Sequence, residues 1–289
     1  MSVGLSRAAR AGLFIKHPAA IERLRRIDTI FLDKTGTLTE GRATVSRWAG
    51  APEAPSLALL LESGSDHAVA RALRRSLAHP TGVVPEIDGV REVAGAGIAG
   101  RVGDLDVRVG NRGFMDAAAV GVSGELDAHG AALLADGLSP LYVAAAGQVI
   151  GVAGVGDPLR ADARATVAAL QRQGIEPWIL SGDHPVVVSR VAASLGIPAA
   201  HASGGMSPED KRDRVRDFVA ARHGKGRLAM VGDGVNDAAA MALSDVGVAV
   251  EGGAGAALLA ADVVVTRAGL SPLLDLLRGS RRLLGVIYR

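Results

Sequence analysis

The chain has 289 residues, of which 48% are hydrophobic but only 3% are aromatic, so its core must be built from alanine, valine, leucine and isoleucine. Lysine and arginine number 32 against 30 aspartates and glutamates, and this balance argues against a dedicated nucleic-acid binder, in which a strongly basic surface is expected. There is no cysteine, which excludes a disulfide framework and a thiolate metal site. The length is enough for two domains of about 150 residues each.

Membrane-spanning and secretion signals are not predicted. No uncharged apolar run reaches the roughly 18 residues that a membrane helix needs. The best candidate, Ala131 to Val155, is interrupted by Asp136 and Pro140. Met1 to Lys16 lacks the unbroken apolar region that is typical of a signal peptide. We therefore expect the chain as given to be soluble.

Residues 1–27 are predicted to form a basic helical segment. Leu13, Ile21 and Leu24 recur at helical spacing, and several arginines lie between them, which favours an amphipathic helix. A basic helix face is often simply solvated. It can also lie beside a membrane, because anionic lipid attracts it, and the sequence leaves both interpretations open.

The run Ile27 to Leu32 is apolar and is typical of a buried strand. It ends at Asp33, which opens the string Asp-Lys-Thr-Gly-Thr-Leu-Thr-Glu-Gly. Ligands of open α/β sheets bind at the carboxyl ends of strands, and an aspartate there can attack a phosphoryl group to form an aspartyl-phosphate. Gly36 and the neighbouring threonines predict a turn whose free backbone N–H groups suit phosphate oxygens. A lone aspartate of this kind would more often only cap a turn.

Residues 44–149 have a different pattern. Two helices are predicted, over residues 55–63 and 67–78. Short glycine-separated strands are predicted over residues 83–93, 97–102, 105–109, 141–145 and 148–155. Short strands around a few helices indicate an α+β domain, which is inserted after the Asp33 strand and ends near residue 149.

Residues 28–43 and 150–268 are predicted to form one discontinuous domain. Its strands (177–180, 227–231, 246–250, 262–265) alternate with helices (159–173, 185–195, and one from 207). This alternation predicts an α/β fold with a doubly wound parallel sheet and helices on both faces. Residues 269–289 are predicted to be a separate C-terminal helical segment.

Three polar residues lie at the ends of these later elements, in positions that suit phosphate chemistry. Ser181 and Asp183 come directly after a strand, where a small hydroxyl can hydrogen-bond a phosphoryl oxygen. Lys211 lies at the start of a helix, where a lysine can neutralise a transferring phosphate. Read alone, the triplet could be a glycine turn and the lysine a solvated side chain.

The string Gly232-Asp233-Gly234-Val235-Asn236-Asp237 places two carboxylates and an amide at another strand end. Mg²⁺ prefers oxygen ligands and keeps several waters, so one or two carboxylates and a phosphate suffice to bind it. Asp233 is the first candidate for a ligand. Asn236 and Asp237 are expected to support it from outside the ligand set. The alternative is that these residues only form a turn.

These strings together resemble the heavy-metal-transporting P-type ATPases, copper pumps in particular, within the haloacid dehalogenase-like superfamily. Asp33 to Gly41 matches that family's phosphorylation signature, and the resemblance covers nearly the whole chain. It implies an enzyme that transfers the γ-phosphoryl group of ATP to Asp33 with Mg²⁺. By the resemblance, the metal ligands are Asp33, Asp233 and the main-chain carbonyl of Thr35, and Lys211 is the family's core-domain lysine.

The inserted domain resembles the nucleotide-binding domain of the same family. By resemblance, Glu62 and His67 contact adenine, and the glycine motif lets the backbone approach the nucleotide at Gly95, Gly97 and Ile98. Asn111 is similar to the residue that binds near the ribose or the phosphates. These glycines lie between two strands, which disfavours a dinucleotide-binding fold.

The sequence departs from the family at a few positions. Ser181 stands where the family usually has threonine, and Asp66 and Ala68 flank His67 in place of glutamate and proline. Asp157 resembles the family's hinge residue, although we interpret it as the N-cap of the next helix.

Several parts of a complete pump are missing from the sequence. Membrane helices, a cysteine-containing transport motif and an actuator Thr-Gly-Glu sequence are absent, so the resemblance implies membrane-spanning and actuator portions as partners and a place on the cytoplasmic side of the membrane. Copper is favoured only because it is the commonest cargo of the family. One alternative is a free-standing phosphatase, but Thr35 occupies the position of its acid–base residue, and a hydroxyl is a poor general base. Another is a nucleotide-binding module without turnover.

Overall fold

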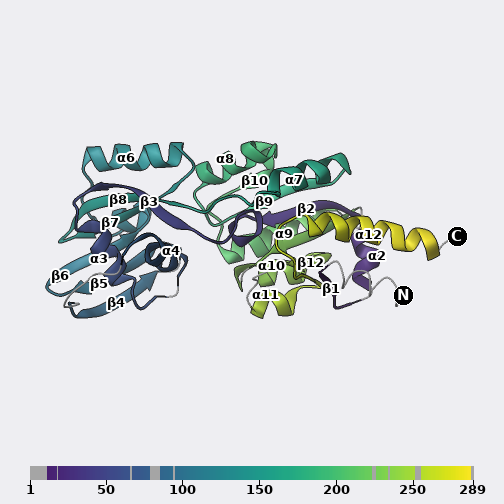
Figure 1. The fold of residues 1–289 in the computed structure, drawn as a ribbon, viewed down its shortest axis with the longest axis horizontal. Coiled ribbons are helices and arrows are strands. Elements are labelled where there is room, and N and C mark those ends of the chain that lie inside the picture. Colours follow the sequence, from purple (N-terminus) through teal and green to yellow (C-terminus); the bar gives the residue numbers. More distant parts are fainter. Residues whose placement is uncertain are drawn as a thin grey trace. The chain divides into compact units, whose positions relative to one another are not determined.

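The computed structural model describes residues 12–17, 19–65, 67–78, 85–93, 95–222, 226–233, 235–250 and 255–287. The chain divides into two compact units. We call Met1–Gly41 with Pro158–Arg289 the core unit, and Arg42–Asp157 the inserted unit. The prediction of an α/β domain interrupted by an α+β insertion is confirmed (Figure 1).

The core unit contains a seven-stranded sheet in the order β1-β13-β12-β11-β2-β9-β10. The strands are β1 (Leu13–Ile15), β2 (Ile27–Asp33), β9 (Glu176–Leu180), β10 (Ala202–Ser203), β11 (Arg227–Gly232), β12 (Val246–Ala249) and β13 (Val263–Val265). All neighbouring strands are parallel except β1, which pairs antiparallel with β13. The parallel sheet brings the carboxyl ends of β2, β9 and β11 to one edge.

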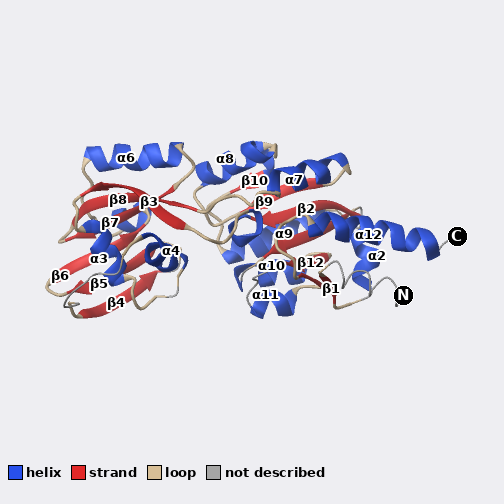
Figure 2. Cartoon of the chain, viewed as in Figure 1, coloured by secondary structure: helices blue, strands red, loops and turns tan. Residues whose placement is uncertain are grey.

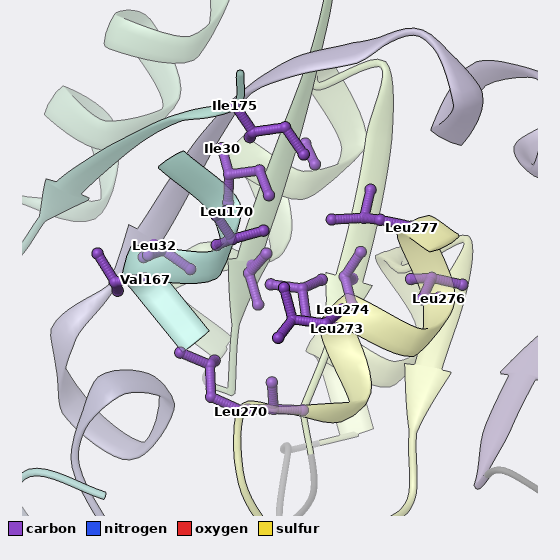
Figure 3. Close-up of a cluster of buried hydrophobic side chains, with 14 of the residues drawn as sticks. Ile30, Leu32, Val167, Leu170, Ile175, Leu270, Leu273, Leu274, Leu276 and Leu277 are labelled. Carbon is purple, nitrogen blue, oxygen red and sulfur yellow. The ribbon is translucent and has the colours of Figure 1, made fainter. Parts of the chain in front are cut away.

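Helices cover both faces of this sheet. The helices are α2 (Ala19–Arg25), α7 (Ala163–Arg172), α8 (Pro185–Leu195), α9 (Pro208–Ala221), α10 (Ala238–Leu243), α11 (Gly255–Ala260) and α12 (Pro272–Ile287). Successive side chains of a strand point to opposite faces, so Ile30 and Leu32 pack with α7 and α12, as Figure 3 shows, while Phe31 packs with α9 and α10. Burial on both faces explains the continuous apolar run of β2.

The inserted unit is built on a six-stranded antiparallel sheet in the order β3-β8-β7-β6-β5-β4. The strands are β3 (Thr44–Gly50), β4 (Ile87–Val93), β5 (Gly97–Val102), β6 (Leu105–Gly110), β7 (Ser139–Ala145) and β8 (Gln148–Gly156). Helices α3 (Ala54–Leu61) and α4 (Ala68–Ser76) pack on one face, and α5 (Arg112–Asp116) and α6 (Gly124–Ala135) pack on the other. Figure 2 shows α6 across the strands from α3 and α4.

The predicted helical segment over residues 1–27 is wrong in part. Residues 1–11 lie outside the described part of the chain, Leu13–Ile15 is the edge strand β1, and only Ala19–Arg25 is helical. The strand forms because pairing with β13 supplies hydrogen-bond partners for its backbone groups. This tertiary interaction overrides the helical spacing of its apolar side chains. Arg23 pairs with Asp262 at 2.9 Å, so part of the basic face is tied to the core unit.

The boundaries of the insertion also differ from the prediction. The inserted unit ends at Asp157, not near residue 149, because β8 pairs with both β3 and β7 of its sheet. An apolar strand has the same sequence pattern in either sheet, so the pattern could not decide to which of the two sheets β8 belongs. Asp157 does not cap the next helix, since α7 begins at Ala163; its Oδ1 accepts a hydrogen bond from the Arg42 N–H at 3.0 Å instead.

The C-terminal segment is not separate from the core unit. Leu273, Leu274, Leu276 and Leu277 of α12 are buried in the same cluster as Leu24 of α2, and Figure 1 shows the two helices in contact at that end of the unit. Helices α5 and α6 were not predicted at all; α5 is very short, and α6 is rich in glycine and alanine. Within the residues that the structure describes, no helix combines the length and the apolar character needed to cross a membrane.

Candidate active site

Asp33 is the last residue of β2, which lies between β11 and β9 in the core unit, and it is only 5% exposed. The chain then turns sharply through Lys34–Leu38. Gly36 has a φ of +71°, and a Cβ atom at this position would lie 1.7 Å from Asp233 Oδ2. Because glycine alone has no Cβ atom, Gly36 is what allows the loop to lie directly against Asp233.

The loop is held by its own hydrogen bonds. The Gly36 N–H donates to Thr39 Oγ1 at 3.0 Å, and both the hydroxyl and the N–H of Thr39 donate to the Lys34 carbonyl at 3.1 Å. The sequence-based expectation that the backbone N–H groups of this turn are free is therefore wrong for Gly36. The Thr37 hydroxyl is fully buried and finds no hydrogen-bond partner among the described residues.

Arg160, which the sequence did not indicate, fixes the outer side of this loop. Its Nε donates to the Thr37 carbonyl at 2.9 Å, and its Nη2 donates to the Gly36 carbonyl at 2.6 Å. A guanidinium group presents several donors in a rigid plane, so one side chain holds two consecutive peptide groups. Its motif, Asp-Pro-Leu-Arg, is the only signal in the sequence that could have pointed to it.

Three carboxylates gather at the ends of β2 and β11. Oxygen atoms of Asp33, Asp233 and Asp237 all lie within 4.8 Å of one another. Lys211 Nζ donates to Asp33 Oδ1 at 2.5 Å and to Asp237 Oδ1 at 2.9 Å. The lysine is placed by the first turn of α9, which begins with a capping box between Ser207 and Asp210.

Burial and the neighbouring charges both shift the pKa values of these groups. Burial, and then the charge of Asp237, raise the pKa of Asp33 to about 7, although Lys211 opposes the rise. Burial and Asp237 likewise raise the pKa of Asp233 to about 6. Burial lowers the pKa of Lys211, but the Asp33 and Asp237 carboxylates raise it by more, so the lysine stays charged. The cluster therefore carries more negative charge than one lysine can balance.

The donor set of this cluster fits a magnesium ion. Closely spaced carboxylate oxygens are the ligands that Mg²⁺ prefers, and thiolate or imidazole donors that would favour other metals are not among them. Asp237, which the sequence placed outside the ligand set, is 1% exposed and belongs to the cluster itself. Asn236 is exposed on the short turn Val235–Asp237.

The predicted residues after β9 lie beside this cluster. Leu180, which precedes Ser181, is opposite Asp33 in the register of β9 with β2. Ser181 Oγ donates to Asp183 Oδ2 at 3.3 Å, and the Asp183 N–H donates to Ser181 Oγ at 3.2 Å. Asp183 also forms an ion pair with the buried Lys34. Asp183 therefore links the two loops, and Lys34 is a second residue that the sequence analysis missed.

In the inserted unit, the predicted adenine contacts lie at the junction of α3 and α4. Glu62 caps the carboxyl end of α3 and is 5% exposed, whereas His67 precedes α4 and is exposed. The loop between them is held by Arg74, whose Nη1 donates to the carbonyls of Glu62 and Ser65 at 3.3 and 3.0 Å. Burial and the nearby charge of Glu92 raise the pKa of Glu62 to about 7.

The backbone of the inserted unit itself requires glycine at two positions of the glycine motif. A Cβ atom at Gly97 would lie 2.4 Å from the Val109 carbonyl, and Gly95 has a φ of +72°. The Ile98 side chain is 3% exposed in the core under α3, so only its backbone could reach a nucleotide. Asn111 caps α5: its Oδ1 accepts from the Phe114 N–H at 2.9 Å, and its Nδ2 donates to the Gly95 carbonyl at 3.0 Å. Asn111 therefore holds the glycine loop in place.

Comparison with known proteins agrees with this architecture. The family model "haloacid dehalogenase-like hydrolase" matches residues 27–245. The cation-transporting P-type ATPase B of Mycobacterium tuberculosis is 36% identical over 98% of this chain. The chain spans only 38% of the length of that relative.

Two solved structures resemble the chain over nearly its full length. A zinc-transporting PIB-type ATPase in the E2.Pi state superposes with a TM-score of 0.70 and 32% identity, over 99% of this chain and 46% of that one. The catalytic domain of the CPx-ATPase CopB-B superposes with a TM-score of 0.71 and 26% identity, over 95% of this chain and 98% of that one. The match to an isolated catalytic domain is thus nearly complete on both sides.

Proposed function

Because this chain belongs to the haloacid dehalogenase-like hydrolases, we propose that it is the ATP-binding and phosphorylation portion of a heavy-metal-transporting P-type ATPase. The observation that carries the proposal is the buried Asp33–Lys211 pair at 2.5 Å, placed beside Asp233 and Asp237 at the end of a central strand. The near-complete match to a CPx-ATPase catalytic domain supports the same assignment. Copper is one cargo that would fit the resemblance, and the cargo-selecting residues would belong to the membrane portion.

The reaction is the transfer of the γ-phosphoryl group of ATP to Asp33. An oxygen of the Asp33 carboxylate attacks the γ-phosphorus, the bond to the bridging β–γ oxygen breaks, and ADP leaves with that electron pair. Lys211 holds the attacking carboxylate by its 2.5 Å hydrogen bond and offsets charge as the phosphoryl group arrives. The Thr37 hydroxyl, which has no hydrogen-bond partner among the described residues, is a donor available to a phosphoryl oxygen. The Ser181 hydroxyl, which donates to Asp183, would exchange that bond for one to the phosphoryl group.

A bound magnesium ion would supply neutralising charge to the phosphoryl oxygens. We propose Asp33, Asp233 and the main-chain carbonyl of Thr35 as its ligands, and the proximity of Asp237 to both carboxylates adds a third acidic oxygen to the set. Asp183, tied to Lys34, would keep the loop after β9 against the loop after β2.

ATP itself would bind to the inserted unit, with Glu62 and His67 at the adenine and the glycine loop, held by Asn111, near the ribose and phosphates. The membrane-spanning and actuator portions of the pump would act as partners, and the chain would lie on the cytoplasmic side of the membrane. The actuator would supply the base that hydrolyses the phosphoenzyme, because the exposed Thr35 is a poor base in that role.

The proposal is tested by acid-quench labelling of the full chain with γ-labelled ATP, followed by a chase with unlabelled ATP. We expect a small amount of label that decays slowly, because a positioned base typically contributes about 10²–10⁴-fold to such a step and none is present at Thr35. Asp33→Asn should abolish the label, and Asp217→Asn, which changes an exposed aspartate of the same unit, should not.

The competing assignment is a free-standing phosphatase of the same family. Rapid, metal-cargo-independent turnover in which Asp33 remains essential would establish that assignment and refute ours.

A further inference from the structure

Arg160 makes three hydrogen bonds to the loop that follows Asp33. Its side chain donates to the Gly36 carbonyl at 2.6 Å and to the Thr37 carbonyl at 2.9 Å. Its backbone N–H donates to the Leu38 carbonyl at 2.9 Å. A single residue of the segment in which the chain re-enters the core unit therefore holds three consecutive carbonyl groups of the loop.

The loop does not satisfy these carbonyls by itself. In a regular helix, the Gly36 carbonyl would accept from the N–H group four residues later, that of Glu40. The backbone leaves helical geometry at Thr35, which has φ −75° and ψ 127°, and at Gly36. The Glu40 N–H donates to the Pro158 carbonyl at 2.9 Å instead. The Gly36 carbonyl therefore requires a donor from outside the loop, and Arg160 supplies it.

We propose that Arg160 is a positioning residue for phosphoryl transfer to Asp33, which acts by fixing the two peptide groups that flank Thr37. The inference rests on the proposed function, because it concerns the same reaction. Arg160 acts on the reacting atoms only through the loop, so its contribution is to geometry and not to the chemical step itself.

The orientation of the held peptide groups is the first step of the argument. Peptide groups are planar and trans, so their C=O and N–H bonds point in opposite directions. The N–H groups of the three held peptides therefore point away from Arg160. The third of them, the Thr39 N–H, donates to the Lys34 carbonyl at 3.1 Å, and Lys34 adjoins Asp33. Arg160 thus lies on the outer side of the loop and turns the inner side toward the start of the loop at Asp33.

Thr37 lies between two of the held peptide groups. Its Cα atom joins the peptide of the Gly36 carbonyl to that of the Thr37 carbonyl, and one rigid guanidinium group binds both. The direction of its Cα–Cβ bond is fixed as a result. The Thr37 hydroxyl is fully buried and has no hydrogen-bond partner among the described residues. Since an unpaired buried polar group costs free energy, this hydroxyl is a donor that the fold holds ready for another acceptor.

The held segment also lies against the acidic cluster. A Cβ atom at Gly36 would be 1.7 Å from Asp233 Oδ2, and oxygen atoms of Asp233 and Asp33 lie within 4.8 Å of each other. Release of the Gly36 carbonyl would let the loop move relative to both carboxylates. A displacement of about 1 Å in a reacting arrangement can cost about 10²-fold in rate.

The test is a double-mutant cycle, measured by acid-quench labelling of the full chain with γ-labelled ATP. Arg160→Ala removes both side-chain bonds, and Thr37→Val removes only the hydroxyl. Each change alone should lower the initial rate of label formation about tenfold or more. Because Arg160 acts on Thr37, the double variant should lose far less than the product of the two single losses. Losses that multiply would overturn the inference.

Two further measurements separate positioning from stability. Thr37→Val should unfold at the denaturant concentration of the wild type, because the hydroxyl that it removes has no partner to lose. Each variant of the cycle should bind ATP within about twofold of the wild type, so that the loss lies in the rate and not in affinity. If Arg160→Ala does not fold, Arg160→Lys enters the cycle with the same expectation, because lysine keeps the charge but lacks the planar fork.

The matched control is Arg164→Ala, which removes an exposed arginine from the first turn of α7 in the same unit and should form label at the wild-type rate. A wild-type rate for Arg160→Ala, or equal losses of rate in Arg160→Ala and Arg164→Ala, would overturn the inference and leave the proposed function intact. A wild-type chain that forms no label would overturn both.

Discussion

The reacting groups of the core unit are buried and paired, whereas three of the proposed nucleotide contacts of the inserted unit, His67, Gly95 and Asn111, are exposed to solvent. Asp33 and Lys211 are each 5% exposed and hydrogen-bond each other across β2 and α9. The His67 side chain is 49% exposed, and the ion pair that it could form with Glu92 spans 3.9 Å. Charge stabilisation of a transition state requires groups that are already fixed. Binding of a substrate from solution requires an accessible surface.

This difference predicts how substitutions will behave in each unit. In the core unit, a change to one group leaves buried charges without their partner, so both stability and chemistry should suffer. In the inserted unit, a change to an exposed contact should alter affinity and its pH dependence and have little effect on folding.

The largest effect on stability is expected from Lys211→Ala. Removal of one partner from a buried ionic cluster costs about 3–5 kcal/mol, because the remaining charges are left uncompensated. Chemical unfolding should show this loss for Lys211→Ala, and added Mg²⁺ should restore part of it by replacing the lost positive charge. Arg212→Ala, which removes the next, partly exposed cation of α9, should change stability by no more than about 0.5 kcal/mol. Equal stabilities for the two variants would show that the cluster is not held by Lys211.

A smaller effect is expected from Gly36→Ala, and the chain offers a matched control. Gly36 and Gly174 have nearly the same φ, +71° and +73°, but a Cβ atom would meet Asp233 at Gly36 and no atom within 4 Å at Gly174. Gly174→Ala should therefore cost only the left-handed backbone strain of about 1–2 kcal/mol. Gly36→Ala should cost more and should also weaken Mg²⁺ binding, measured by calorimetry. Unchanged Mg²⁺ affinity would contradict the placement of the loop against Asp233.

The smallest effect is a pH dependence of stability that arises from Glu62. Its pKa in the folded chain, about 7, is above the ordinary value of 4.5. The folded state therefore binds the proton more tightly, so the contribution to stability is complete below the unfolded pKa and is lost as pH rises to about 7. Thermal unfolding of Glu62→Gln should lack this decline, and a decline equal to that of the wild type would assign it to other groups.

Much of the core-unit site could be predicted because several of its residues directly follow strands. Asp33, Ser181 and Asp233 come after apolar runs, and parallel strands bring their carboxyl ends to one edge. Arg160 and Lys34 were missed because their contacts join loops whose relative positions only the folded sheet defines.

The inserted unit was harder to predict in detail for the same reason. Glu92 meets His67 only through the register of β4 with β5, which no local pattern encodes. Asn111 was recognised as important from its motif, but its role as the cap of α5 depends on a helix that the sequence did not indicate.

The central claim is that one unit binds ATP and the other carries the reacting aspartate, and calorimetry of ATP with two single variants tests it directly. Asp33→Asn should bind ATP with an affinity within about twofold of the wild type, while His67→Ala should bind about tenfold more weakly, as expected for one lost contact to the base. Unchanged affinity in His67→Ala, or a large loss in Asp33→Asn, would contradict the division of binding and chemistry between the two units.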